Sequence, residues 1–246
     1  MPHNEYIREV ENAKIAYLFI HGIIGSPDHF NKLIDLIPKN CSIYNLLLDG
    51  HGGSIEDFAQ TSMKKWEKQV EETVKYLEKK YNDIIIIGHS MGTLLSINIA
   101  LKYPNKVRHL FLLSVPLKVN VKQSALTDAL KVIFNKIKSD DLTAEAAKIA
   151  HGIETDQNII KYITWLPRYI ELFHKIYKTD KVLSNLKIPT TAIQSLNDEL
   201  VSSKTYEMLK KYEQIETIIL KNSTHYYYTD EDYKIITDEF TKIILT

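Results

Sequence analysis

The sequence of 246 residues contains one cysteine, Cys41, so no disulfide can form within the chain. The 31 basic and 31 acidic residues give a net charge of zero at pH 7, which provides no overall positive field for nucleic acid or an anionic membrane. No window approaches the roughly 18 apolar residues of a membrane span, and the first residues are polar and charged. The sequence therefore predicts a cytoplasmic protein with no stable membrane anchor and no nucleic acid partner.

Several cofactor motifs are also missing. Neither Gly-x-Gly-x-x-Gly nor a Gly-Lys-Ser/Thr sequence is present, which argues against a nucleotide site. There are no cysteine pairs and no His-Glu-x-x-His, which argues against a metal site. We therefore expect neither a cofactor nor a metal ion.

Four isoleucines at residues 84–87 lead into Gly88-His89-Ser90-Met91-Gly92. The isoleucine run has no polar side and favours a strand buried on both faces, whereas the largely apolar residues after Ser90 favour a buried helix. A Gly-x-Ser-x-Gly between a strand and a helix predicts a very sharp turn with a strained serine, where side chains in place of Gly88 and Gly92 would collide with neighbouring elements. Ser90 is therefore the candidate nucleophile, at the carboxyl end of the sheet.

Strand and helix patterns alternate along the first half of the chain, and strands return near the end. This order predicts an α/β fold with a doubly wound, mainly parallel sheet and helices on both faces. After a short edge strand at residues 6–10, the expected strands are residues 15–20, 41–48, 84–87, 107–115, 189–196 and 215–220. An amphipathic helix closes the chain.

Between residues 116 and 186 we find no strand pattern, only apolar residues at helical spacing, with an interruption at Pro167. We expect a helical cap at residues 117–186, inserted after the sixth strand and lying over the carboxyl edge of the sheet. Residues 1–116 and 187–246 then form the core of one structural domain.

A serine hydroxyl becomes a good nucleophile only with a neutral base within reach, itself oriented by an acid. Of nine histidines, only His225 follows the last predicted strand, and Asp198 follows the strand before it. Loops after parallel strands open on one edge, so both should lie near Ser90. Glu199 is the alternative acid; Asp198 is preferred because it stands first after its strand. We expect His3 and His29 to be solvated.

The oxyanion of an acyl-transfer reaction needs two backbone N–H groups that already point at it. Met91 supplies one from the start of the helix after Ser90. Ile23, which follows His21-Gly22 on an adjacent strand, is the expected second donor. His21 and the histidine at position 51 are expected to be structural hydrogen-bonding residues in their turns.

The segments HGIIGS, DGHGGS, GHSMG, NDELV and STH resemble those of the α/β-hydrolase superfamily, in particular carboxylesterases and monoacylglycerol lipases with a small helical cap. The resemblance implies that Ser90, Asp198 and His225 form the triad, with Ile23 and Met91 as oxyanion donors. Relatives such as haloalkane dehalogenases and epoxide hydrolases carry Asp at the nucleophile position, and prolyl aminopeptidases typically have Gly-Gly-Ser-Trp-Gly.

The chain departs from the family at two loops. Asp49 stands where proline often precedes Gly-His-Gly, and Ser223-Thr224 stand where glycine often precedes the histidine of the triad. These differences affect the loop structure on either side of the expected site.

From these residues we expect a serine hydrolase that cleaves small carboxylic esters with an apolar acyl group, through an acyl-enzyme on Ser90. The same triad would also serve a thioesterase, a C–C hydrolase, a lactonase or a cofactor-free perhydrolase. A receptor that binds a small molecule without cleaving it is the remaining alternative.

Overall fold

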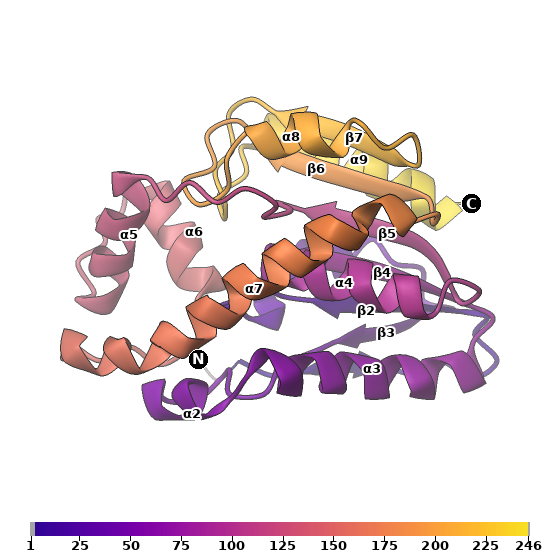
Figure 1. Ribbon diagram of the computed structural model, residues 1–246, viewed down its shortest axis with the longest axis horizontal. Coiled ribbons are helices and arrows are strands. Elements are labelled where there is room, and N and C mark those ends of the chain that lie inside the picture. Colours follow the sequence, from indigo (N-terminus) through magenta and orange to yellow (C-terminus); the bar gives the residue numbers. More distant parts are fainter. Residues whose placement is uncertain (1–2, 246) are drawn as a thin grey trace.

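A computed structural model describes residues 3–245 and contains one seven-stranded sheet covered by helices (Figure 1). The strands lie in the order β1-β3-β2-β4-β5-β6-β7, with β1 antiparallel to β3 and all other neighbours parallel. The predicted doubly wound, mainly parallel sheet is confirmed. The strands are β1 (Tyr6–Arg8), β2 (Ile15–Ile20), β3 (Ser42–Asn45), β4 (Asp83–His89), β5 (Val107–Leu113), β6 (Thr190–Ser195) and β7 (Ile215–Leu220).

The isoleucine strand β4 lies at the centre of the sheet, between β2 and β5. Ile84 and Ile86 face a hydrophobic cluster that includes side chains of α3 (Met63–Lys80) and α4 (Met91–Lys102). Ile85 and Ile87 face the opposite cluster, with side chains of α9 (Asp230–Leu245). Since successive side chains of a strand point to opposite faces, burial on both sides explains why all four positions are apolar.

Serine side chains begin several of the helices. The Ser26 hydroxyl accepts a hydrogen bond from Asp28 N (3.2 Å) at the start of η1 (Pro27–Phe30), which leads into the four-residue α1 (Asn31–Ile34). Ser54 forms a reciprocal capping box with Asp57 at the start of α2 (Ile55–Gln60). Such caps satisfy N–H groups that have no acceptor inside the helix. The remaining core helix is α8 (Lys204–Leu209).

A helical segment lies between β5 and β6. Its elements are α5 (Gln123–Ile133), α6 (Leu142–Ala150), η2 (Ile159–Trp165), α7 (Leu166–Val182) and η3 (Leu183–Asn185). The expectation that it follows the sixth strand is wrong: five strands, β1 to β5, precede it, and these correspond to the five strand patterns that the sequence has before residue 116. The boundaries 117–186 for the cap stay a prediction.

Two local expectations for this segment differ from the structure. Pro167 lies in the first turn of α7, so it begins the helix and does not interrupt one. Proline fits there because the first N–H groups of a helix have no intrahelical acceptor. The helix α6, capped by the Asp141 side chain on Ala144 N (3.2 Å), has no counterpart in the apolar pattern, because much of it consists of alanine.

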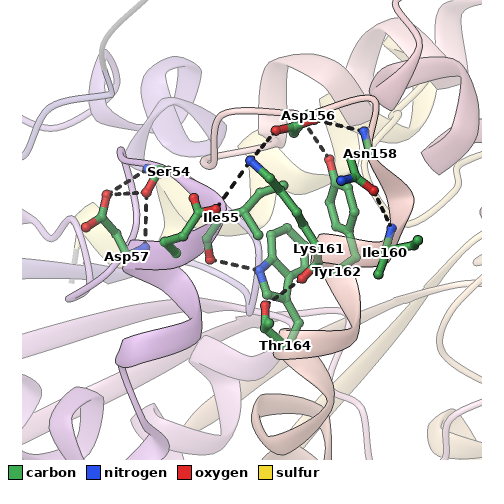
Figure 2. A network of polar contacts seen from close by, with 11 residues as sticks. Ser54, Ile55, Asp57, Asp156, Asn158, Ile160, Lys161, Tyr162 and Thr164 are labelled. Carbon is green, nitrogen blue, oxygen red and sulfur yellow. Dashed lines mark hydrogen bonds and ion pairs between the residues drawn. The ribbon is translucent and has the colours of Figure 1, made fainter.

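Polar contacts fasten this segment to the core (Figure 2). The indole N–H of Trp165 donates to the carbonyl oxygen of Ile55 (3.1 Å), and Lys161 pairs with Asp156 (2.5 Å) and with Glu56 (3.4 Å). Further along, α7 packs against both α3 and α4. The second half of α7 therefore covers the core, while its first half extends past the carboxyl edge of the sheet beside α2 (Figure 1).

The helices within residues 3–245 were compared with the length and hydropathy that a bilayer requires, and none of them is suited to cross a membrane.

Gly92 gives a direct test of the packing between α4 and β2. A Cβ atom at this position would lie 1.9 Å from the carbonyl oxygen of Ile20, which is backbone and cannot move aside. We expect Gly92→Ala to lower the free energy of unfolding by at least about 3 kcal/mol, the upper part of the range for overpacked cores. Chemical denaturation followed by circular dichroism measures the loss.

The matched control is Lys102→Ala, at the exposed end of the same helix, which should change the free energy of unfolding by about 0.5 kcal/mol or less. Equal stability of the two variants would contradict the packing described here.

Candidate active site

Ser90 is the single residue between the end of β4 and the start of α4. Its backbone has φ 52° and ψ −121°, a conformation that costs free energy for a non-glycine residue, and its N–H donates to the carbonyl oxygen of Leu113 (2.9 Å). A Cβ at Gly88 would lie 2.7 Å from Ser96 Oγ and 2.9 Å from the backbone of Gly92. Both glycines are therefore required by close backbone approach at this turn.

His225 lies in the loop after β7 and is fully buried. Its Nδ1 is 2.8 Å from Oδ2 of Asp198, which lies in the loop after β6. The other carboxylate oxygen of Asp198 accepts hydrogen bonds from the N–H groups of Leu200 (2.8 Å) and Val201 (2.7 Å). Because the carboxylate accepts, His225 Nδ1 carries a proton and Nε2 is the free base. This Nε2 is buried and has no hydrogen-bond partner among residues 3–245.

His89 joins the serine turn to the histidine loop. Its ring centroid lies 4.8 Å from that of His225, and its Nε2 lies 3.0 Å from the carbonyl oxygen of His225. Because His89 immediately precedes Ser90, this contact holds the backbone of His225 beside the turn of the candidate nucleophile. Within the described chain no hydrogen bond joins Ser90 Oγ to His225, and such bonds often tighten only when substrate binds.

Burial and pairing act in opposite directions on the ionisation of Asp198 and His225. Burial by itself raises the pKa of Asp198, but the nearby His225 and the hydrogen bonds to the carboxylate outweigh it, so the pKa lies below its ordinary value. Burial lowers the pKa of His225, but the charge and hydrogen bond of Asp198 raise it above 6.5. The pair is therefore suited to hold a proton transferred to the imidazole.

Glu199, the alternative acid, does not contact the imidazole ring by a hydrogen bond. Its Oε2 accepts from the backbone N–H of His225 (3.0 Å), while Asp198 takes the ring nitrogen. Burial raises the pKa of Glu199 above its ordinary value. The geometry therefore favours Asp198 as the orienting acid.

The predicted oxyanion loop lies against Ser90. A Cβ at Gly22 would be 3.2 Å from Ser90 Cβ. The next amide, Ile23 N, donates no hydrogen bond within residues 3–245, and the Ile23 carbonyl accepts one from His51 Nε2 (2.6 Å). Met91 N is the first amide of α4 and has no intrahelical acceptor. The assignment of Ile23 N and Met91 N to an oxyanion hole stays a prediction.

The other predicted histidine roles are resolved by the contacts. His21 donates from Nδ1 to the Gly22 carbonyl (2.9 Å) and accepts from Leu48 N (3.1 Å), a structural role like that of His51. The expectation that His29 is solvated is wrong: its ring lies 4.0 Å from the ring of His89, because η1 packs over the serine turn. His89 has no role in the sequence-based predictions, although its position inside the Gly-x-Ser-x-Gly motif was a signal.

Asp49 and Ser223, which differ from the family pattern, both make polar contacts with neighbouring side chains. Asp49 accepts from Thr61 Oγ1 (2.6 Å) and pairs with Lys65 (3.2 Å), so its charge is engaged by residues flanking the α2–α3 junction. Ser223 is fully buried and donates to Asp232 Oδ2 (2.7 Å), which ties the histidine loop to α9. These side chains therefore anchor the loops in which they occur.

Several known proteins are similar to this chain. A thermostable monoacylglycerol lipase from Bacillus sp. (strain H-257) is 30% identical over 96 residues, which cover 39% of this chain and 38% of the lipase. Among solved structures, one from a study of the metagenome-derived lipolytic enzymes LipS and LipT has a TM-score of 0.75 at 18% identity and covers 99% of this chain and 98% of its own. The Paleococcus ferrophilus monoacylglycerol lipase has a TM-score of 0.68 at 16% identity, covering 100% and 97%.

The curated relatives are matched over about two fifths of their own length, and the solved structures, at these identities, establish the α/β-hydrolase fold. A family model described as serine aminopeptidase, S33, matches residues 11–232, which is most of the chain and includes every residue of the site. The chain therefore belongs to the serine aminopeptidase S33 family of α/β hydrolases.

Proposed function

We propose that this protein is a serine hydrolase that cleaves carboxylic esters, with Ser90 as nucleophile, His225 as general base and acid, and Asp198 as the orienting acid. The observation that carries the proposal is the buried 2.8 Å contact between His225 Nδ1 and Asp198, which leaves Nε2 unpaired beside the strained serine turn. Relatives named as lipases support the ester as the bond that is cleaved.

The first half of the reaction forms the acyl-enzyme. His225 Nε2 takes the proton of Ser90 Oγ while that oxygen attacks the acyl carbonyl carbon. The carbonyl oxygen becomes negative and accepts hydrogen bonds from Ile23 N and Met91 N, the two proposed oxyanion donors. Asp198 stabilises the imidazolium that forms. Collapse of the tetrahedral intermediate breaks the ester C–O bond, and His225 donates its proton to the leaving alcohol.

The second half repeats these steps with water. His225, neutral again, takes a proton from a water molecule whose oxygen attacks the acyl carbon on Ser90. The same two amides hold the negative oxygen. When the intermediate collapses, the acid product leaves, and the proton on His225 returns to Ser90 Oγ. No other group is needed to balance the protons.

The helical segment carries exposed apolar side chains that we propose as the contact surface for an apolar acyl group. Leu166, Ile170, Phe173 and Tyr177 recur at spacings of four, three and four residues along α7, and each is more than half exposed. Such spacing places them on one side of the helix, while the opposite side packs on α3 and α4. An exposed apolar stripe of this kind often marks a binding surface.

Other substrates of the same triad remain alternatives: thioesters, lactones, C–C bonds or peroxide. The family model is described by a peptidase activity, so an aminoacyl anilide is an informative competing substrate. A receptor without activity is less favoured, because a buried Asp–His pair is expensive to desolvate and binding alone does not require it. Comparison of esters, acyl-CoA thioesters and aminoacyl anilides at equal concentration ranks these classes.

A cytoplasmic location is also part of this proposal. Cys41 is unpaired and buried, and burial raises the pKa of its thiol, as in an inert structural cysteine. The net charge of zero supports a small-molecule partner over nucleic acid.

The nucleophile is tested by Ser90→Ala. We expect hydrolysis of p-nitrophenyl esters to fall at least about 10³-fold, because no other hydroxyl takes the place of Ser90 Oγ. Covalent labelling by a fluorophosphonate should be lost as well. Ser203→Ala, at an exposed serine whose side chain makes no capping bond, is the control and should keep both signals. Labelling of the Ser90 variant would contradict the assignment.

The base is tested by the pH dependence of kcat/KM. Only neutral His225 can accept the proton, and its pKa is raised above 6.5 by Asp198. Activity should therefore be full above that pKa and fall tenfold per pH unit as the pH decreases through it. Asp198→Asn removes the charge that raises the pKa, so the acid limb should move to lower pH and the plateau should drop about 10⁴-fold. Asp238→Asn, exposed on α9, is the control. A flat profile would rule out His225.

The apolar stripe is tested by the pair Ile170→Ser and Phe173→Ser. If the acyl chain contacts α7, kcat/KM should fall roughly tenfold for a long-chain p-nitrophenyl ester and remain unchanged for the acetate, since apolar contacts discriminate by chain length. Ile7→Ser, half-exposed on β1 away from the helical segment, should affect neither substrate. Equal loss on both esters would contradict acyl binding by the stripe.

A further inference from the structure

Two buried side chains hold the backbone of His225. The N–H of His225 donates to Glu199 Oε2 at 3.0 Å, and its carbonyl oxygen accepts from His89 Nε2 at 3.0 Å. Glu199 is 9% exposed and His89 is 1% exposed. Side chains therefore hold both the N–H and the carbonyl group of His225. Its ring is held separately by Asp198.

The two contacts come from different sides of the site. His89 is the residue immediately before Ser90, so it connects the turn of the nucleophile directly to the loop of the base. Glu199 follows Asp198, so the loop after β6 holds His225 twice, once at the ring and once at the backbone. Any shift of His225 relative to Ser90 would break at least one of these hydrogen bonds.

The ring of His89 is held in place by its neighbours. Ring centroids of His29 and Tyr226 lie 4.0 Å and 5.6 Å from it, and His225 follows at 4.8 Å. Burial lowers the pKa of His89 well below its ordinary value, so the ring is neutral and its single proton is on Nε2, where it is donated to the His225 carbonyl. His89 therefore orients His225 without adding a charge beside it.

Other contacts of the loop between β7 and α9, such as the hydrogen bond from Ser223 to Asp232 Oδ2 (2.7 Å), do not involve His225 itself. Thr224 N donates to the Tyr227 carbonyl (2.8 Å) and Thr229 N donates to Ser223 Oγ (3.3 Å), both within the loop itself. Because a displacement of about 1 Å between reacting groups can cost roughly 100-fold in rate, the placement of the loop matters for proton transfer.

We propose that His89 and Glu199 are positioning residues for the base: together they clamp the backbone of His225 between the serine turn and the acid loop, so that Nε2 is held within reach of Ser90 Oγ. This inference rests on the proposed function. It predicts an effect on kcat that exceeds any effect on KM, since neither side chain is placed to bind the ester.

The first experiment compares His89→Leu with His89→Gln in the full chain. Leucine removes the donor, so kcat should fall about 10- to 100-fold with KM within about twofold. The glutamine amide can donate from a similar position. We therefore expect the decrease in log kcat for His89→Gln to be at most two thirds of the decrease for His89→Leu. The rate of fluorophosphonate labelling should follow kcat in both variants. His174→Leu, exposed on α7, is the matched control.

The second experiment compares Glu199→Leu with Glu199→Gln. Glutamine keeps an oxygen that accepts from His225 N–H but removes the negative charge, whereas leucine removes both. We expect the plateau kcat to fall about tenfold for leucine and clearly less for glutamine. Both variants should move the acid limb of the pH profile to lower pH, because the charge of Glu199 contributes to the raised pKa of His225. Glu207→Gln, exposed on α8, is the control.

The pH readout depends on every group that faces His225. These groups are Asp198 and Glu199 from the loop after β6, His89 from the serine turn, His29 from η1, and Tyr226 from the histidine loop itself. Because His89 is neutral, its variants should leave the acid limb where it is. The two pairs of variants therefore separate positioning from charge.

The outcomes are distinct. Wild-type kcat in both leucine variants would overturn the clamp, as would equal kcat for each leucine variant and its glutamine counterpart. If both leucine variants fail to fold, His89→Ala and Glu199→Ala, which also remove the two hydrogen bonds, take their place: wild-type kcat in both would overturn the proposal. An unmodified chain that shows neither hydrolysis nor fluorophosphonate labelling would instead refute the proposed function itself.

Discussion

The sharp turn at Ser90 is the constraint on which the rest of the site depends. One residue separates β4 from α4, and it adopts a strained backbone conformation. The turn is possible only because Gly88 and Gly92 let the strand, the helix and the neighbouring Ile20 carbonyl approach closely. The Gly22 loop lies against this turn, and the histidine loop is joined to it through His89. The active-site residues come from separate strands, but their spacing is set here.

The pKa of His225 is shifted in the opposite direction from the pKa values of the other buried histidines. Burial lowers the pKa of six histidines, which are His21, His29, His51, His89, His109 and His151. These remain neutral and act through hydrogen bonds and ring packing. His225 is fully buried, but Asp198 and Glu199 face it and raise its pKa. The candidate base differs from its neighbours because the β6 loop supplies two carboxylates, and its protonated form is therefore tolerated inside the protein.

The core and the helical segment have different proposed roles. The core contains the candidate triad, whose Asp198 and His225 are buried in loops that follow strands. The segment between β5 and β6 is docked to the core by Trp165 and Lys161 (Figure 2), yet it leaves a stripe of large apolar side chains exposed along α7. Under the proposed function, the chemistry depends on the core and the choice of substrate on the helical segment.

The sequence by itself determined the sheet, the Gly-x-Ser-x-Gly turn and the chain order of Ser90, Asp198 and His225, because these features depend on local patterns: apolar runs, glycines and positions at strand ends. Only the tertiary structure decided that α6 forms and that Pro167 begins α7. It also decided that Asp198 accepts a hydrogen bond from the imidazole of His225 while Glu199 accepts one from its backbone N–H. The hydrogen bond from His89 to the His225 carbonyl was likewise decided only by the tertiary structure. Such choices depend on distances of about 3 Å between residues far apart in the chain, which local patterns do not encode.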